Sequence, residues 1–150
     1  MELKSAAFEN EGMIPSKFTC DGADVSPALE WGSLPENTKS LALICDDPDA
    51  PIGTWVHWVY YDIPAAADGL PEDVGSQEHP ECGGTQGKSD FGSIGYGGPC
   101  PPGGTHRYFF KLYALDAMLN LGPGETKSEL LKIMEGHILE QAELMGKYAR

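Results

Sequence analysis

Apolar and polar residues alternate with a period of two over much of the chain, which predicts β-strands. The pattern is clearest after Thr105, where His106, Tyr108 and Phe110 fall on one face of an extended segment and Arg107 on the other. Further short strands are expected at 3–8, 29–31, 40–45 and 54–63, separated by turns rich in proline and glycine. This spacing favours a mainly β fold, an antiparallel β-sandwich, over βαβ units.

Helical periodicity appears only near the C-terminus. Thr126-x-x-Glu129 is a capping box that precedes an apolar stripe at 130, 131, 133 and 134. Gly136 interrupts the pattern, and residues 138, 142 and 145 give a second stripe at helical spacing. We therefore expect one or two short C-terminal helices. The chain contains no internal repeat and no low-complexity linker, so residues 1–150 are expected to form one domain.

Two rigid loops each lead into a strand that carries a histidine. The loop at 46–51 precedes a strand on which Trp55, His57, Val59 and Tyr61 are expected to share a face, and the loop at 98–104 precedes His106. Each histidine could be a core residue satisfied by a carbonyl or a carboxylate. The parallel contexts favour a shared binding site, because pockets are commonly built where loops meet strand ends.

The sequence of these loops resembles a known family. Asp47-Pro48-Asp49-Ala50-Pro51, Trp55-x-His57 and Gly98-Pro99 followed by His106-Arg107-Tyr108 are similar to the two signature regions of the phosphatidylethanolamine-binding proteins, which include the Raf kinase inhibitor proteins. The flanking segments fit the bacterial and archaeal branch of that family; they are Ile14-Pro15, 26–31, Ile63-Pro64, Asp90-Phe91-Gly92 and Gly136-His137. The resemblance implies a Greek-key β-sandwich with a small surface pocket that accepts phosphate, phosphoethanolamine or a phospholipid head group.

The resemblance also implies roles for individual residues. Eight are expected to bind ligand: Asp47, Asp49, Pro51, His57, Gly98, Pro99, His106 and Tyr108. One of the two aspartates is expected to be structural and the other to face the ligand, and the sequence leaves open which is which. Trp55 is expected beneath the site, with Cys100 and Arg107 supporting the loop, Arg107 through a salt bridge. No cofactor or metal is expected, and the implied role is a non-catalytic regulator or inhibitor of a kinase or protease.

An enzyme is the alternative interpretation. His57, His106 and either Asp47 or Asp49 could form a two-histidine, one-carboxylate metal site, or could perform acid–base hydrolysis without metal. No recognisable motif positions a nucleophile. Gly87-Lys88-Ser89 ends like a phosphate-binding loop, but the required first glycine is a cysteine, and Asp90-Phe91-Gly92 only resembles the kinase triplet.

Composition limits the partners and the compartment. The formal net charge of −13 argues against nucleic acid and anionic bilayers. No apolar stretch is long enough for a signal peptide or a stable membrane insertion, so a cytoplasmic protein is expected. The four cysteines could form two disulfides, but free thiols are expected in a reducing compartment, with Cys45 as a small buried hydrophobe.

Two geometric expectations complete the sequence analysis. The tight reversal at 47–51 predicts a cis peptide bond between Ala50 and Pro51. Relatives outside the bacterial and archaeal branch typically have a further helix beside the pocket mouth, whereas this sequence ends at Arg150 with its last four residues expected to lie extended against the sheet. We therefore expect a homodimer formed near the pocket face.

Overall fold

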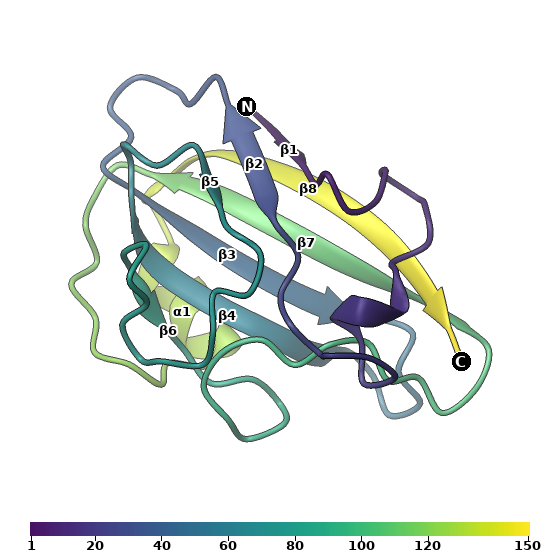
Figure 1. Cartoon of the computed structure of the whole chain (residues 1–150). Helices are drawn as coiled ribbons and strands as arrows, with labels where there is room; N and C mark the ends of the chain where they lie inside the picture. The colour runs from purple at the N-terminus through teal and green to yellow at the C-terminus, as the bar shows by residue number, and fades with distance from the viewer.

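The computed structural model describes residues 1–150 and consists of two antiparallel β-sheets packed face to face (Figure 1). The small sheet has the strand order β1-β2-β5, and the large sheet has the order β6-β4-β3-β7-β8. The elements in chain order are β1 (Glu2–Lys4), the 3-10 helix η1 (Ser16–Phe18), β2 (Leu29–Gly32), β3 (Ser40–Asp47), β4 (Trp55–Pro64), β5 (Gly69–Leu70), β6 (Thr85–Gln86), β7 (Thr105–Leu115), α1 (Lys127–Met134) and β8 (Ile138–Ala149). The predicted mainly β sandwich is confirmed.

The central strand β3 separates two hydrophobic cores. Leu41 and Leu43 point into the core between the two sheets, whereas Ala42 and Ile44 point to the opposite face of the large sheet. Because both faces of β3 are covered, all of its residues are buried and its sequence is a continuous apolar run without alternation.

Helix α1 covers the outer face of the large sheet. The predicted capping box is present: the Thr126 Oγ1 accepts from the Glu129 N–H at 3.3 Å, and the Glu129 Oε1 accepts from the Thr126 N–H at 2.9 Å. Leu130 and Met134 are fully buried against the sheet. The helix therefore closes the second core.

The second predicted helix is wrong, because residues 138–149 form strand β8. β8 pairs with β7 along its whole length, from Leu115 opposite Ile138 to Thr105 opposite Ala149. Its buried side chains alternate from Ala142 onward, and this period of two was concealed by the glycine at 146. The long free edge of β7 supplies backbone partners that an isolated short helix would lack. The C-terminal residues do lie extended, as the sequence predicted.

The predicted cis bond before Pro51 is also wrong, since the chain contains no cis peptide bond. The reversal is made instead by Gly53, whose φ of +116° is accessible only to glycine at low cost. The Gly53 N–H donates to the Ala50 carbonyl at 3.1 Å, which closes the turn.

Candidate ligand-binding site

A cavity of about 430 Å³ lies beyond the C-terminal end of β3, where β4 and β7 begin. Its wall comes from three parts of the chain: the loop and strand at 47–57, Phe91, and the loop and strand at 100–108. Five of the eight predicted ligand-binding residues line it, namely Asp47, Pro51, His57, His106 and Tyr108. The two loop-then-strand units of the sequence analysis therefore meet at one cavity.

His106 and Asp47 form a buried pair in this cavity. The His106 Nδ1 lies 2.7 Å from the Asp47 Oδ2, and the two side chains are only 9% and 4% exposed. The carboxylate fixes the imidazole with its proton on Nδ1. Nε2 is then the ring nitrogen that remains for a ligand. Of the two candidate aspartates, Asp47 is the one in the cavity wall.

His57 is held by a backbone carbonyl. Its Nδ1 donates to the Gly97 carbonyl oxygen at 2.7 Å, which leaves Nε2 without a protein partner. The ring packs edge to face against Tyr108 and Phe91, with centroids 5.2 and 5.3 Å away. Burial lowers the pKa of His57 below its usual value, so the ring is neutral at pH 7 and its Nε2 is an acceptor.

A β-bulge in β4 determines which face His57 occupies. The pairing of β4 with β3 shifts by one residue at this position, which leaves His57 as the extra residue. Trp55 and His57 consequently line the cavity, whereas Val59 and Tyr61 point to the opposite face, against α1. The expectation that all four residues share one face is therefore wrong from the bulge onward.

The Tyr108 hydroxyl is the one buried side-chain polar atom in the structure without a hydrogen-bond partner. The residue is 1% exposed, and burial raises the pKa of its phenol, which therefore stays protonated. An unsatisfied buried hydroxyl costs about 1–3 kcal/mol of folding free energy. Such groups are normally satisfied, and Tyr108 is one of the residues that line the cavity.

Asp49 is turned away from the cavity and binds Arg107. The Asp49 carboxylate accepts from the Arg107 Nε, Nη2 and backbone N–H at 2.9, 2.8 and 3.0 Å. The side-chain hydrogen bonds with Arg107 lower the pKa of Asp49 to about 2. The salt bridge expected for Arg107 is confirmed, and it occupies the Asp49 carboxylate, which does not line the cavity.

Gly98 and Pro99 do not line the cavity either. The Gly98 N–H donates to the Asp24 Oδ1 at 2.8 Å, and the Pro99 carbonyl accepts from the Cys20 N–H at 3.1 Å. Both residues are buried against the segment that follows η1. They hold the loop rather than contribute to the cavity surface.

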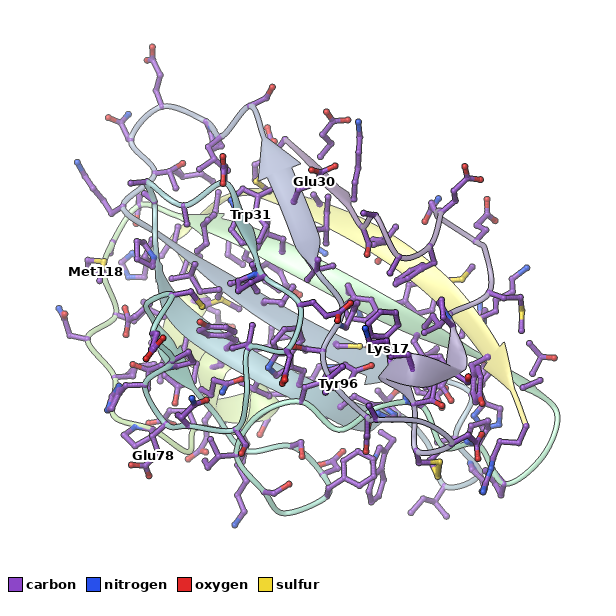
Figure 2. All side chains as sticks on the ribbon, in the orientation of Figure 1. Lys17, Glu30, Trp31, Glu78, Tyr96 and Met118 are labelled. Atoms are coloured by element: carbon purple, nitrogen blue, oxygen red, sulfur yellow. A yellow bond between two sulfur atoms is a disulfide. The ribbon has the colours of Figure 1, made fainter.

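Cys20 and Cys100 form a disulfide, with 5.4 Å between their Cα atoms, so the expectation of free thiols is wrong for this pair. The bond lies at the end of the sandwich near the C-terminus (Figure 2). The two cysteines are 80 residues apart in sequence and are brought together by the packing of the Gly98–Pro99 backbone on the Cys20 segment. Cys45 and Cys82 are free, and Cys45 is buried as predicted.

Sequence reasoning missed much of the apolar wall. Ala50, Ile52, Phe91, Pro101 and Pro102 all contribute to it. Phe91 is positioned by Asp90, whose N–H donates to the Val56 carbonyl while its Oδ2 accepts from the Val56 N–H. The triplet at 90–92 is part of the family resemblance, but the sequence alone did not assign Phe91 to the binding site. The signal that could have found it was its place within the family resemblance.

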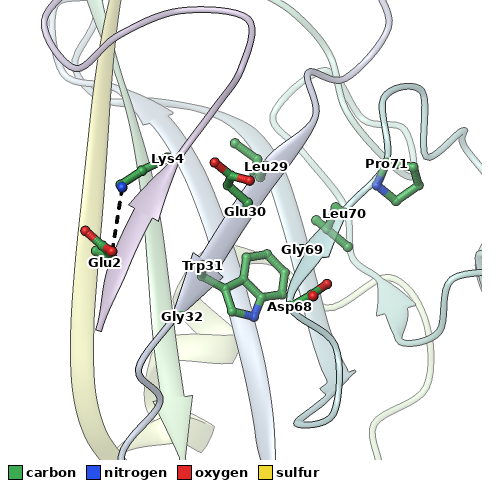
Figure 3. A pocket seen from close by; sticks show the side chains of 10 residues that line it. All are labelled: Glu2, Lys4, Leu29, Glu30, Trp31, Gly32, Asp68, Gly69, Leu70 and Pro71. Carbon is green, nitrogen blue, oxygen red and sulfur yellow. Dashed lines mark ion pairs between the residues drawn. The ribbon is translucent and has the colours of Figure 1, made fainter.

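A second hollow, of about 540 Å³, lies over the small sheet (Figure 3). It is larger than the histidine cavity, but its polar lining is acidic, with Glu2, Glu30 and Asp68 against the single base Lys4, which pairs with Glu2 at 3.7 Å. It contains no histidine, cysteine or hydroxyl group. Its larger volume alone therefore does not make this hollow a better candidate ligand-binding site than the histidine cavity.

The structure contains no group of three or more His, Cys, Asp or Glu residues arranged to hold a metal ion. In the histidine cavity, the Asp47 carboxylate is hydrogen-bonded to His106, and the Nδ1 of His57 is hydrogen-bonded to the Gly97 carbonyl. No helix of the protein is long and apolar enough to cross a membrane.

The protein is therefore an antiparallel β-sandwich with a histidine-lined cavity at one end. The phosphatidylethanolamine-binding protein model matches residues 4–149, and the chain belongs to that family. A UPF0098 protein of Methanothermobacter thermautotrophicus is 53% identical over 150 residues, which cover 100% of this chain and 99% of the relative. A UPF0098 protein of Aquifex aeolicus is 51% identical, over 100% of this chain and 89% of its own length.

Solved structures agree with this assignment. The crystal structure of a phosphatidylethanolamine-binding protein homologue from Chlamydia trachomatis superposes with a TM-score of 0.92 at 41% identity, over 99% of this chain and 97% of that one. Escherichia coli YbcL, described as a member of the mammalian family, superposes with a TM-score of 0.90 at 32% identity, over 99% and 98% of the two chains.

Proposed function

We propose that this protein is a non-catalytic binding protein whose histidine cavity takes a small anion, such as phosphate or the phosphoethanolamine head group. The observation that carries the proposal is the buried Tyr108 hydroxyl, which has no protein partner and belongs to a residue that lines the cavity together with two histidines. A ligand oxygen would satisfy this hydroxyl. The Nε2 atoms of His57 and His106 would donate to the same anion once protonated.

Charge in the cavity is compatible with an anion despite the acidic chain. The carboxylate of Asp47 is paired with His106, and that of Asp49 with Arg107 outside the cavity. Neither aspartate therefore presents an unpaired charge to the ligand. Imidazolium stabilised by a bound anion would supply the positive charge, since a nearby opposite charge raises the pKa of histidine.

The rest of the wall favours an anion that carries an apolar substituent. Six apolar or aromatic side chains surround the polar end, namely Pro51, Ile52, Trp55, Phe91, Pro101 and Pro102. Ile52 is 89% and Phe91 46% exposed at the cavity mouth. The regulatory contact with a kinase or protease that the resemblance implies would use this same exposed rim.

Binding is favoured over the hydrolytic alternative by the absence of a nucleophile. The cavity wall contains no serine, threonine or lysine, and its one cysteine, Cys100, is in the disulfide. The Asp47–His106 pair could polarise a water molecule, but no second group is placed to stabilise a developing oxyanion except the Tyr108 hydroxyl.

The test is calorimetric titration of phosphoethanolamine into the wild type and Tyr108→Phe. We expect weak binding that falls by about tenfold to a hundredfold in the variant, because one charge-assisted hydrogen bond contributes about 1.5–3 kcal/mol. Tyr113→Phe is the matched control, since Tyr113 lies on the same strand but faces the core against α1. Undiminished affinity in a His57→Ala, His106→Ala double variant would show that the anion binds elsewhere.

A further inference from the structure

The loop at 98–104 contributes Cys100, Pro101 and Pro102 to one wall of the cavity, and hydrogen bonds fix it only before Cys100 and from β7 onward. Gly98 and Pro99 make backbone hydrogen bonds with Asp24 and Cys20. Residues 101–104 make none, with backbone or side chain. Two of these four residues are prolines without an N–H, and the two glycines that follow are exposed, so the loop cannot hold itself through its own backbone.

The Cys20–Cys100 disulfide is therefore the last tether of the wall before β7 begins at Thr105. Cys100 itself, with Pro101 and Pro102 directly after it, lines the cavity. The tether attaches the wall to a well-fixed segment, because the Tyr96 hydroxyl donates to the Phe18 carbonyl at 2.7 Å and the Tyr148 hydroxyl donates to Asp21 at 2.5 Å.

Both cysteines of the disulfide are exposed, so a dithiol in solution can reach the bond. The remaining cysteines differ in this respect: Cys45 is buried in the core, and Cys82 is half-buried beside Tyr60. Neither of them lines the cavity. A reductant would thus change the cavity at one bond only.

We propose that the Cys20–Cys100 disulfide is a redox clamp on the cavity wall, and that its reduction by a dithiol lowers the affinity for the anion; the second part rests on the proposed function. A thiolate of the dithiol attacks one sulfur, forms a mixed disulfide and releases one cysteine. The second thiol displaces the other cysteine, which leaves two protein thiols and an oxidised dithiol after the transfer of two electrons. Without the tether the wall loses its preorganisation, and binding must order it again.

The experiment measures phosphate binding and amide hydrogen exchange on the oxidised protein, after dithiothreitol, and after reoxidation. A Cys20→Ser, Cys100→Ser variant reproduces the reduced state without reductant, and near-ultraviolet circular dichroism verifies that it is folded. Cys82→Ser is the matched control, because it removes a free thiol outside the cavity. It should respond to dithiothreitol as the wild type does.

We expect reduction to weaken phosphate binding by about fivefold to tenfold, reversibly, with faster exchange at the hydrogen-bonded amides of Cys20 and Gly98 beside the disulfide. If phosphate binds equally well in both redox states, the clamp is overturned whatever the exchange shows. If phosphate binds in neither redox state, the proposed function is wrong. Amide hydrogen exchange alone then tests whether the disulfide fixes the cavity wall. Faster exchange at the hydrogen-bonded amides of Cys20 and Gly98 would support the clamp, and unchanged exchange at these amides would overturn it.

Discussion

Asp46 and Asp47 are consecutive residues of β3 whose buried carboxylates lie on opposite faces of the large sheet. The Asp47 carboxylate binds His106 in the cavity, whereas the Asp46 carboxylate accepts from Lys127 at 2.6 Å and Lys111 at 3.3 Å beside α1. The alternation of a strand thus places one carboxylate at the candidate site and its neighbour in a structural ion pair. The same chemical change at each position should therefore have different consequences.

The first prediction is that Asp47→Asn impairs anion binding and Asp46→Asn impairs stability. Asp47→Asn removes the carboxylate that accepts from the His106 Nδ1 at 2.7 Å and fixes the ring with Nε2 free for the ligand, so the affinity for phosphate should fall. Asp46→Asn removes a carboxylate that two lysines share and should cost about 1.5–3 kcal/mol of the free energy of unfolding. Titration calorimetry and urea denaturation on both variants provide the measurements. The reverse pattern would contradict the assignment of the two faces.

A second prediction concerns pH. Burial lowers the pKa of His57, and an anion bound at Nε2 would raise it again, so binding takes up a proton. The affinity should be highest below the lowered pKa of His57 in the free protein, decrease by up to about tenfold per pH unit as pH rises above it, and level off above the pKa of the complex. Sulfate is the informative probe, since its charge is constant between pH 6 and pH 8.

The measurement is a sulfate titration followed by calorimetry at several pH values in that range. His57→Asn is the matched variant, because its amide nitrogen takes the position of Nδ1 and can still donate to the Gly97 carbonyl but cannot be protonated. It should lose the part of the pH dependence that comes from this residue. An affinity that is independent of pH in the wild type would rule out histidine protonation as the source of the charge.

The third prediction separates Asp49 from Asp47. Asp49 lies outside the cavity and its carboxylate is committed to Arg107, so Asp49→Asn should leave the affinity for phosphate essentially unchanged. The pair is partly exposed, and exposed ion pairs contribute little and are screened by salt. Because the pKa of Asp49 is lowered to about 2, its contribution is present above pH 4 and lost as pH falls towards 2. In acid titration the stability difference between wild type and variant should be constant above pH 4 and disappear as pH falls towards 2.

The sequence predicted the features that depend on local pattern. The alternation in 105–115 predicted that His106 and Tyr108 share a buried face, and both line the cavity. The capping box predicted the start of α1 at Lys127, since the side-chain hydrogen bonds of Thr126 and Glu129 involve only neighbouring residues. These features follow from spacing within about ten residues, where the chain itself fixes the geometry.

Features that depend on tertiary pairing could not be predicted in this way. The bulge at His57 is defined by the register of β4 against β3, and the apolar residues of β8 fit a helix until the free edge of β7 is known. Cys20 and Cys100 are separated by 80 residues, and their pairing requires the loops to be packed first. Likewise, the choice between Asp47 and Asp49 depended on where Arg107 points.

The last prediction tests how the cavity wall is seated. A Cβ atom at Gly98 would lie within 3 Å of backbone atoms of Phe18 and Thr19, whereas a Cβ atom at Gly103 would meet nothing within 4 Å. Gly98→Ala should therefore push the loop off the Cys20 segment and cost about 1–3 kcal/mol of stability. Gly103→Ala in the same loop is the matched control and should be neutral or stabilise by up to about 1 kcal/mol. Thermal unfolding of the two oxidised variants measures the difference. Equal stabilities would show that the loop is seated by the disulfide alone, and that the close backbone approach at Gly98 contributes nothing.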